Sequence, residues 1–89
     1  MDDEEQLAWK AMPYRATVVD RDGAPIGTAE SLLGDEEEDV FHGIVLRRSA
    51  DHKLVEVPAV SVLRITSSRV VTDLDSASTA ALPPYREEH

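Results

Sequence analysis

The chain has 89 residues, of which 42% are hydrophobic and 30% charged, and its formal net charge at pH 7 is −9. It contains no cysteine, which excludes disulfide bonds, thiolate metal sites and thiol nucleophiles together. No apolar run approaches the roughly 18 to 20 residues of a membrane span, and the first residues are acidic where a secretory signal would be basic. We therefore expect a cytoplasmic protein that makes no contact with a membrane.

The negative charge is concentrated in the first part of the chain. Residues 1–39 contain 12 Asp or Glu against three Lys or Arg, a net charge of −9, whereas residues 40–89 contain six of each and are neutral. An acidic surface repels the phosphate backbone of nucleic acids. This argues against direct binding of nucleic acid and favours another protein as the partner, with solubility as the alternative reason for the acidic residues.

Residues 1–15 are expected to form an acidic arm. The block "MDDEEQ" is typical of disordered segments, and Pro13 follows too soon for the intervening apolar residues to build a long helix. Trp9 is the only tryptophan of the chain. Its side chain is expected either to cover an open end of the core or to contact another protein.

The folded domain is expected over residues 16–73, where short β-branched runs alternate with turn residues. A unit of this size buries roughly 60% of the surface that its unfolded chain exposes, so its stability margin is small. The pattern predicts an all-β fold of five or six short antiparallel strands, arranged as a small β-barrel or a sandwich, in which closure removes the exposed strand edges. The expected strands span residues 16–20, 26–33, 40–47, 54–57, 62–66 and 69–73, with one helical turn at 58–61.

Residues 74–89 are expected to form a C-terminal tail with a short helix. Asp75 or Ser76 can cap such a helix, which must end before Pro83. We expect the chain to fray after Leu82.

The stretch "VVDRDGAPIGTAESLL", residues 18–33, is predicted to contain a hairpin turn. A phosphate-binding loop needs a Lys after its glycines at the start of a helix, and neither Gly23 nor Gly27 is followed by one. The pair Asp22-Gly23 between two apolar runs instead fits a tight turn, which requires positive φ. Gly27 is expected to mark a bulge or a close backbone approach.

This stretch, with "FHGIVLRR" and "LVEVPAVSVLRITSSRVVTDLD" behind it, resembles the PRC-barrel family. Members of that family include domains of the photosynthetic reaction centre H subunit and of a ribosome maturation factor. The resemblance implies a small β-barrel that binds other proteins, here as a stand-alone member. It is carried by structural glycines and apolar positions: Val18, Asp20, Gly23, Ile26, Gly27, Val57, Pro58, Val60, Ile65 and Val70.

Two charged segments are candidate interaction sites. The acidic one allows a solvated loop, a docking surface or a divalent-metal site, although consecutive carboxylates do not converge as ligands of an EF-hand do. The basic one is expected to pair with the acidic segment of a second copy, which predicts a homodimer. The acidic segment is Asp35, Glu36, Glu37, Glu38 and Asp39, and the basic one is Arg47, Arg48 and Lys53.

No residue pattern indicates catalysis. The three histidines lack the spacing that places two imidazoles on one metal, and His42, on a strand with Val40 and Ile44, is expected to be partly buried and hydrogen-bonded. No serine lies in a Gly-x-Ser-x-Gly elbow. We therefore expect no enzyme activity, no catalytic residue and no cofactor.

The sequence leaves three functions open. The first is a non-enzymatic protein-interaction or adaptor module of PRC-barrel type. The second is a regulator that binds a small ligand or a divalent metal. The third is an accessory factor in RNA processing or ribosome maturation that acts through protein contacts.

Overall fold

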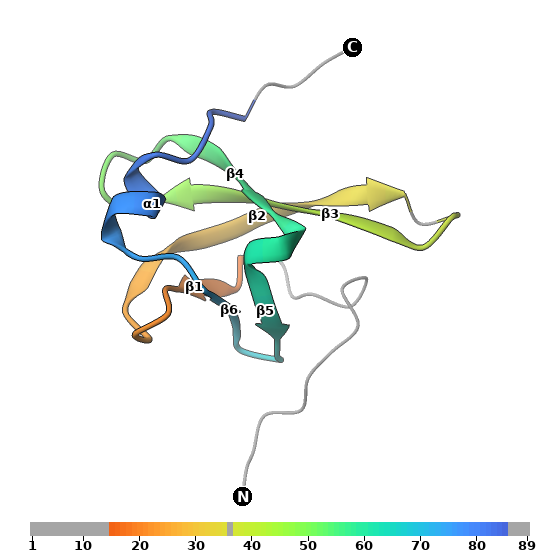
Figure 1. The fold of residues 1–89 in the computed structure, drawn as a ribbon, viewed down its shortest axis with the longest axis horizontal. Helices are drawn as coiled ribbons and strands as arrows, with labels where there is room; N and C mark the ends of the chain where they lie inside the picture. The colour runs from red at the N-terminus through yellow and green to blue at the C-terminus, as the bar shows by residue number, and fades with distance from the viewer. Residues whose placement is uncertain (1–14, 36, 86–89) are drawn as a thin grey trace, which may run out of the picture.

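The computed structural model describes residues 15–35 and 37–85, which form one β-sheet with two short helices (Figure 1). All the predicted strands are present, as is the helical turn between the fourth and the fifth. In chain order the elements are β1 (Thr17–Val19), β2 (Pro25–Asp35), β3 (Val40–Arg48), β4 (Leu54–Pro58), η2 (Ala59–Ser61), β5 (Val62–Ile65), β6 (Arg69–Thr72) and α1 (Ser76–Ala80).

The six strands form a mixed sheet in the order β4-β3-β2-β1-β6-β5. The pairing of β1 with β6 is parallel and the other four pairings are antiparallel. The all-β class is confirmed, but the expected closed antiparallel barrel is wrong. Closure would need β4 to pair with β5, and these two strands instead form opposite ends of the sheet, joined through the 3-10 helix η2.

The core lies between the inward faces of the curved sheet. Alternate positions on each strand supply it, as the period of two along a strand requires. On β3, Ile44 and Leu46 belong to the core cluster, and Val45 between them is also buried, at 1% exposure, without belonging to that cluster. The buried cluster consists of Ala16, Val18, Ala29, Ile44, Leu46, Val55, Val57, Ile65, Val70 and Leu74.

The turn between β1 and β2 is structural. The Asp20 carboxylate accepts hydrogen bonds from the backbone N–H groups of Asp22 and Ala24, both at 2.9 Å, and Gly23 has a φ of 86°. Gly27 lies where β2 passes close to β3, and a Cβ there would collide with the carbonyl oxygen of Arg47. Both glycines therefore meet a requirement of the backbone, Gly23 for positive φ and Gly27 for a close approach of two strands.

The C-terminal segment belongs to the fold as far as Tyr85. Asp75 caps α1 through a capping box with Ser78. Beyond the helix, the N–H of Tyr85 donates to the carbonyl of Leu54 (3.0 Å), and the N–H of Glu56 donates to the carbonyl of Pro83 (2.9 Å). The expectation that the chain frays after Leu82 is therefore wrong for residues 83–85.

Candidate functional site

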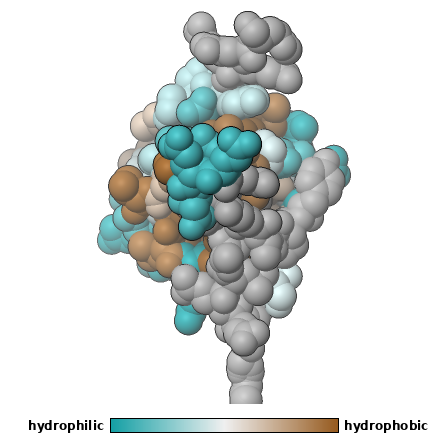
Figure 2. Space-filling view, turned by 90° about the vertical axis from the view of Figure 1, so that its right-hand side faces the viewer, coloured by the Kyte–Doolittle hydropathy of each residue, from teal (hydrophilic) through white to brown (hydrophobic). Residues whose placement is uncertain are grey.

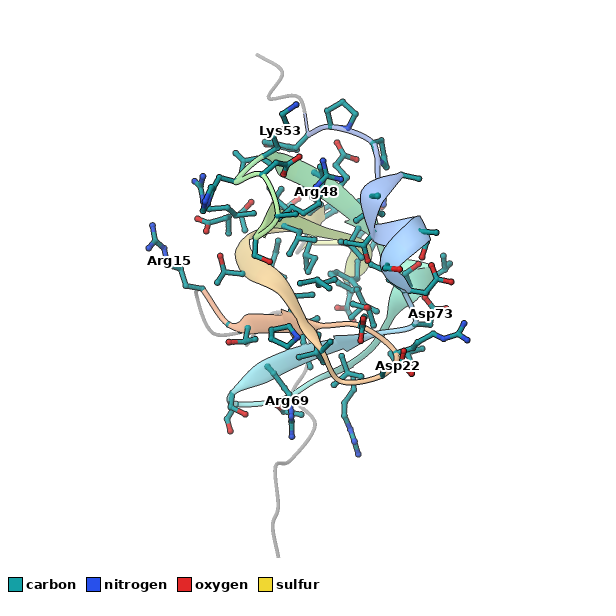
Figure 3. The ribbon with its side chains drawn as sticks, turned by 90° about the vertical axis from the view of Figure 1, so that its left-hand side faces the viewer. Arg15, Asp22, Arg48, Lys53, Arg69 and Asp73 are labelled. Carbon is teal, nitrogen blue, oxygen red and sulfur yellow. The ribbon has the colours of Figure 1, made fainter. Side chains whose placement is uncertain are left out.

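Arg48, one of the predicted basic residues, is engaged within the fold. Its Nε and Nη2 donate to the two carboxylate oxygens of Asp51 at 3.1 and 2.7 Å, and its Nη1 donates to the carbonyls of Thr79 and Ala80 at 3.0 and 3.2 Å. Figure 3 shows this side chain between the β3–β4 turn and α1. Arg48 therefore clamps the last turn of α1 to the sheet.

The contacts of Arg48 and Asp51 shift the pKa values of both groups. The hydrogen bond from Arg48, followed by that from the Lys53 N–H, lowers the pKa of Asp51 to about 2. The same hydrogen bond to Asp51 raises the pKa of Arg48. Both side chains remain charged near neutral pH, as an ion pair that supports the fold.

Arg47 is engaged in a second polar cluster on the sheet surface. Its Nε donates to Glu30 at 3.3 Å, and Thr28 donates to the same carboxylate oxygen at 3.0 Å. Partial burial raises the pKa of Glu30, but the hydrogen bonds from Thr28 and Arg47 and the charges of Arg15 and Arg47 outweigh this effect and lower it. Lys53, the third residue of the predicted basic patch, is exposed. The three residues thus do not form one open basic surface.

The described residues of the acidic segment, Asp35 and residues 37–39, lie at the tip of the β2–β3 hairpin. Asp35 ends β2, and its carboxylate accepts hydrogen bonds from the N–H groups of Glu37 (3.0 Å) and Glu38 (3.3 Å). Asp39, with a φ of 58°, completes the turn. In residues 15–35 and 37–85, no three His, Asp or Glu side chains come close enough to hold a metal ion. Trp9 and Glu36 lie outside the described residues.

His42 is exposed, and the expectation that it is partly buried is wrong. Register shifts along β2 and β3 place Leu33 opposite Gly43 and Gly34 opposite Phe41, so His42 is an extra residue in a β-bulge. The bulge changes which side of β3 faces inward, and Phe41 packs against the core instead. Strict alternation cannot predict such a change.

Two shallow pockets of about 520 Å³ each flank Arg48. One lies between the β1–β2 turn, the β3–β4 turn and α1, and the other between β4 and the C-terminal segment. The charged groups that line the first pocket, Asp20, Arg48 and Asp51, already hold turns or α1 in place. These charged groups therefore make structural hydrogen bonds within the fold.

Among the described residues, the two most exposed large apolar side chains lie in β5 and in the 3-10 helix before it. Val60, in η2, is 85% exposed, and Leu63, in β5, is 57% exposed. Register shifts between Val62 and Arg64, so Leu63 is an extra residue and both Leu63 and Arg64 point into solvent. Arg69 of β6 is also exposed and is a diagonal cross-strand neighbour of Arg64. We refer to Val60, Leu63, Arg64 and Arg69 as the β5 surface.

Sequence reasoning did not select this surface. Leu63 and Ile65 occupy alternate positions, so a regular strand would bury both, and only the bulge exposes Leu63. Val60 is one of the positions that carry the family resemblance, yet its side chain contributes almost nothing to the core. The sequence gives one indication of this surface, which is the apolar residue Val60 in a short turn after Pro58.

No protein-family model matches the chain, and no curated protein is significantly similar to it. Among the described residues, no helix is long and apolar enough to cross a membrane.

Proposed function

We propose that the protein is a non-enzymatic interaction module, a relative of PRC-barrel domains, which docks on another protein through the β5 surface. The proposal rests on the exposure of Val60 and Leu63. Exposed apolar side chains gain free energy when a partner removes them from water, at about 25 cal/mol for each Å² buried. The β5 surface combines two such apolar side chains with arginines, and exposed apolar patches and arginines are both typical of protein-protein interfaces.

The state of the polar groups supports a non-enzymatic role. The charged side chains in the pocket beside α1 are hydrogen-bonded to turns and to helix carbonyls, so they are not poised as an acid and a base. The relationship to PRC-barrel domains is part of the proposal because Gly23 and Gly27, which carry the resemblance, occupy the turn and the close backbone approach that such a pattern requires.

Capture of proteins from an extract of the cells that produce this protein tests the proposed function. We expect the tagged full chain to retain a defined set of proteins, and the double substitution Val60→Asp with Leu63→Asp to lose them. The control is Ala50→Asp with Ala77→Asp, which adds the same charge at two exposed positions outside the β5 surface. Retention by the Val60/Leu63 variant equal to that of the control contradicts the proposal.

A further inference from the structure

The β5 surface has a counterpart elsewhere on the same chain. It combines two exposed apolar side chains with the positive charge of Arg64. The tip of the β2–β3 hairpin combines exposed Val40, at 39%, with the negative charges of Asp35, Glu37 and Glu38. The two surfaces are thus alike in apolar character and opposite in charge, which is the complementarity that steers two proteins together.

The hairpin tip is placed to reach another molecule. Figure 1 shows the β2–β3 hairpin projecting beyond the rest of the sheet. Figure 2, which looks toward that side of the molecule, shows hydrophobic surface exposed around the hydrophilic residues that face the viewer. In a two-fold dimer in which each tip lies on the β5 surface of the other copy, every contact would form twice.

Two of the three basic side chains predicted from the sequence, Arg47 and Arg48, are less suited to this purpose. Arg47 donates to Glu30, and Arg48 donates to Asp51 and to two helix carbonyls, so binding an acidic tip would compete with contacts that hold the fold. Arg64 has no ion-pair partner among residues 15–35 and 37–85. It therefore offers its charge to a second molecule without cost to the fold.

We propose that the β5 surface binds the acidic hairpin tip of a second copy of this chain in a symmetric dimer. This inference rests on the proposed function in using the same surface, and it names the partner. The net charge of −9 on each copy opposes the association. Screening at physiological ionic strength, over roughly 8 Å, weakens that repulsion between distant charges more than it weakens apolar contact.

Substitutions that reverse the charge of one side chain distinguish the pairing of the two surfaces from the overall repulsion between two negatively charged copies. Arg64→Glu and Lys53→Glu both change the net charge from −9 to −11, but only the first lies in the β5 surface. We expect Arg64→Glu to raise the dissociation constant of the dimer about tenfold or more and Lys53→Glu to leave it nearly unchanged. The double substitution Glu37→Lys with Glu38→Lys changes the net charge from −9 to −5 and so reduces the overall repulsion between two copies. We nevertheless expect it to weaken the dimer, because it reverses the charge of the hairpin tip.

Analytical ultracentrifugation at tens of micromolar protein in about 150 mM salt provides the measurement. We expect the wild type to sediment at twice the 9.8 kDa chain mass and the Arg64→Glu and Glu37→Lys/Glu38→Lys proteins to sediment as monomers. An equimolar mixture of these two variants should recover the dimer, because each reversed surface then faces a reversed partner. Recovery on mixing also shows that both variants are folded.

Two results would overturn the inference. One is a wild type that remains at 9.8 kDa. The other is a dimer that is insensitive to Arg64→Glu, since it would use a different surface. Capture of other proteins that depends on Val60 and Leu63 can persist in either case, so the failure of self-association is distinguishable from the failure of the proposed function.

Discussion

The two end strands of the sheet, β4 and β5, are protected in different ways. The C-terminal segment covers β4, where Tyr85 donates to Leu54 and Glu56 donates to Pro83, and Arg48 fixes the helix that leads into this segment. Among the described residues no strand covers β5, and the bulge at Leu63 interrupts its ladder. Covering an edge and bulging it both hinder unwanted strand pairing.

The two solutions have different consequences for the side chains. Covering β4 places Val55 and Val57 in the core, at 2% and 0% exposure. Bulging β5 leaves Leu63 in solvent next to Val60. Stability is therefore expected to depend on the β4 side of the sheet, and binding on the β5 side.

The largest expected effect comes from disrupting the contact of β3 with β4. Gly43 lies opposite Pro58 with a φ of 144°, and a Cβ there would collide with the carbonyl oxygen of Val57. We expect Gly43→Ala to lower the free energy of unfolding by about 3 kcal/mol or more, because it combines a collision with backbone strain. Urea titration measures this change.

The control is Gly23→Ala. Gly23 also has positive φ, at 86°, but no atom lies within 4 Å of the added methyl group. Its expected cost is about 1 to 2 kcal/mol, from backbone strain alone. Equal losses for the two variants would show that the packing of β4 on β3 is not tight at Gly43.

A matched pair of valines compares the two sides directly. Val57 is fully buried on β4, whereas Val60, three residues later, is 85% exposed. We expect Val57→Ala to lower the free energy of unfolding by about 2 kcal/mol and Val60→Ala to change it by less than about 0.5 kcal/mol. A comparable loss at Val60 in urea titration would mean that this side chain supports the fold and is not reserved for a partner.

Removing the guanidinium of Arg48 should loosen the cover over β4. Arg48→Met removes the hydrogen bonds that the guanidinium donates to the Asp51 carboxylate and to the carbonyls of Thr79 and Ala80. We expect a lower Tm and faster hydrogen exchange at the Tyr85 and Glu56 amides. Lys53→Met removes the same charge from an exposed neighbour and should affect neither quantity, so similar changes in both variants would contradict the clamp.

The smallest expected effect is a dependence of the stability of the folded state on pH in the acid range. The pKa of Asp51 is lowered from 3.8 to about 2, chiefly by the hydrogen bond from Arg48. A lowered pKa stabilises the folded state above the unfolded value, so this contribution is present above about pH 4 and is lost as the pH falls toward 2. Asp51 is partly exposed, so solvent screening keeps the contribution small.

Substitution of Asp51 isolates this contribution. Over that pH range we expect the Tm of the wild type to fall more steeply than that of Asp51→Asn, which has no carboxyl to titrate at this position. Parallel curves of Tm against pH for the two proteins would exclude a stabilising role of the ion pair.

Local sequence patterns determined where the strands lie. Runs such as "ATVVD" and "RVVTD" predict strands because β-branched side chains suit an extended backbone, and Asp22-Gly23 predicts a turn because glycine adopts positive φ. Asp75 likewise indicates the start of α1, since its carboxylate satisfies a backbone N–H that the helix leaves unpaired. These properties depend only on residues close together in the chain.

The tertiary structure alone decided the pairing of the strands and the surface that we assign to binding. The parallel contact of β1 with β6 joins residues about 50 positions apart, and Arg48 finds its carbonyl partners 31 and 32 positions away. The bulges that expose His42 and Leu63 depend on how two strands match in register, which neither strand encodes by itself. Side-chain exposure in a short-stranded sheet is therefore set by contacts between distant segments, because one extra residue in a strand reverses the face that every later residue presents.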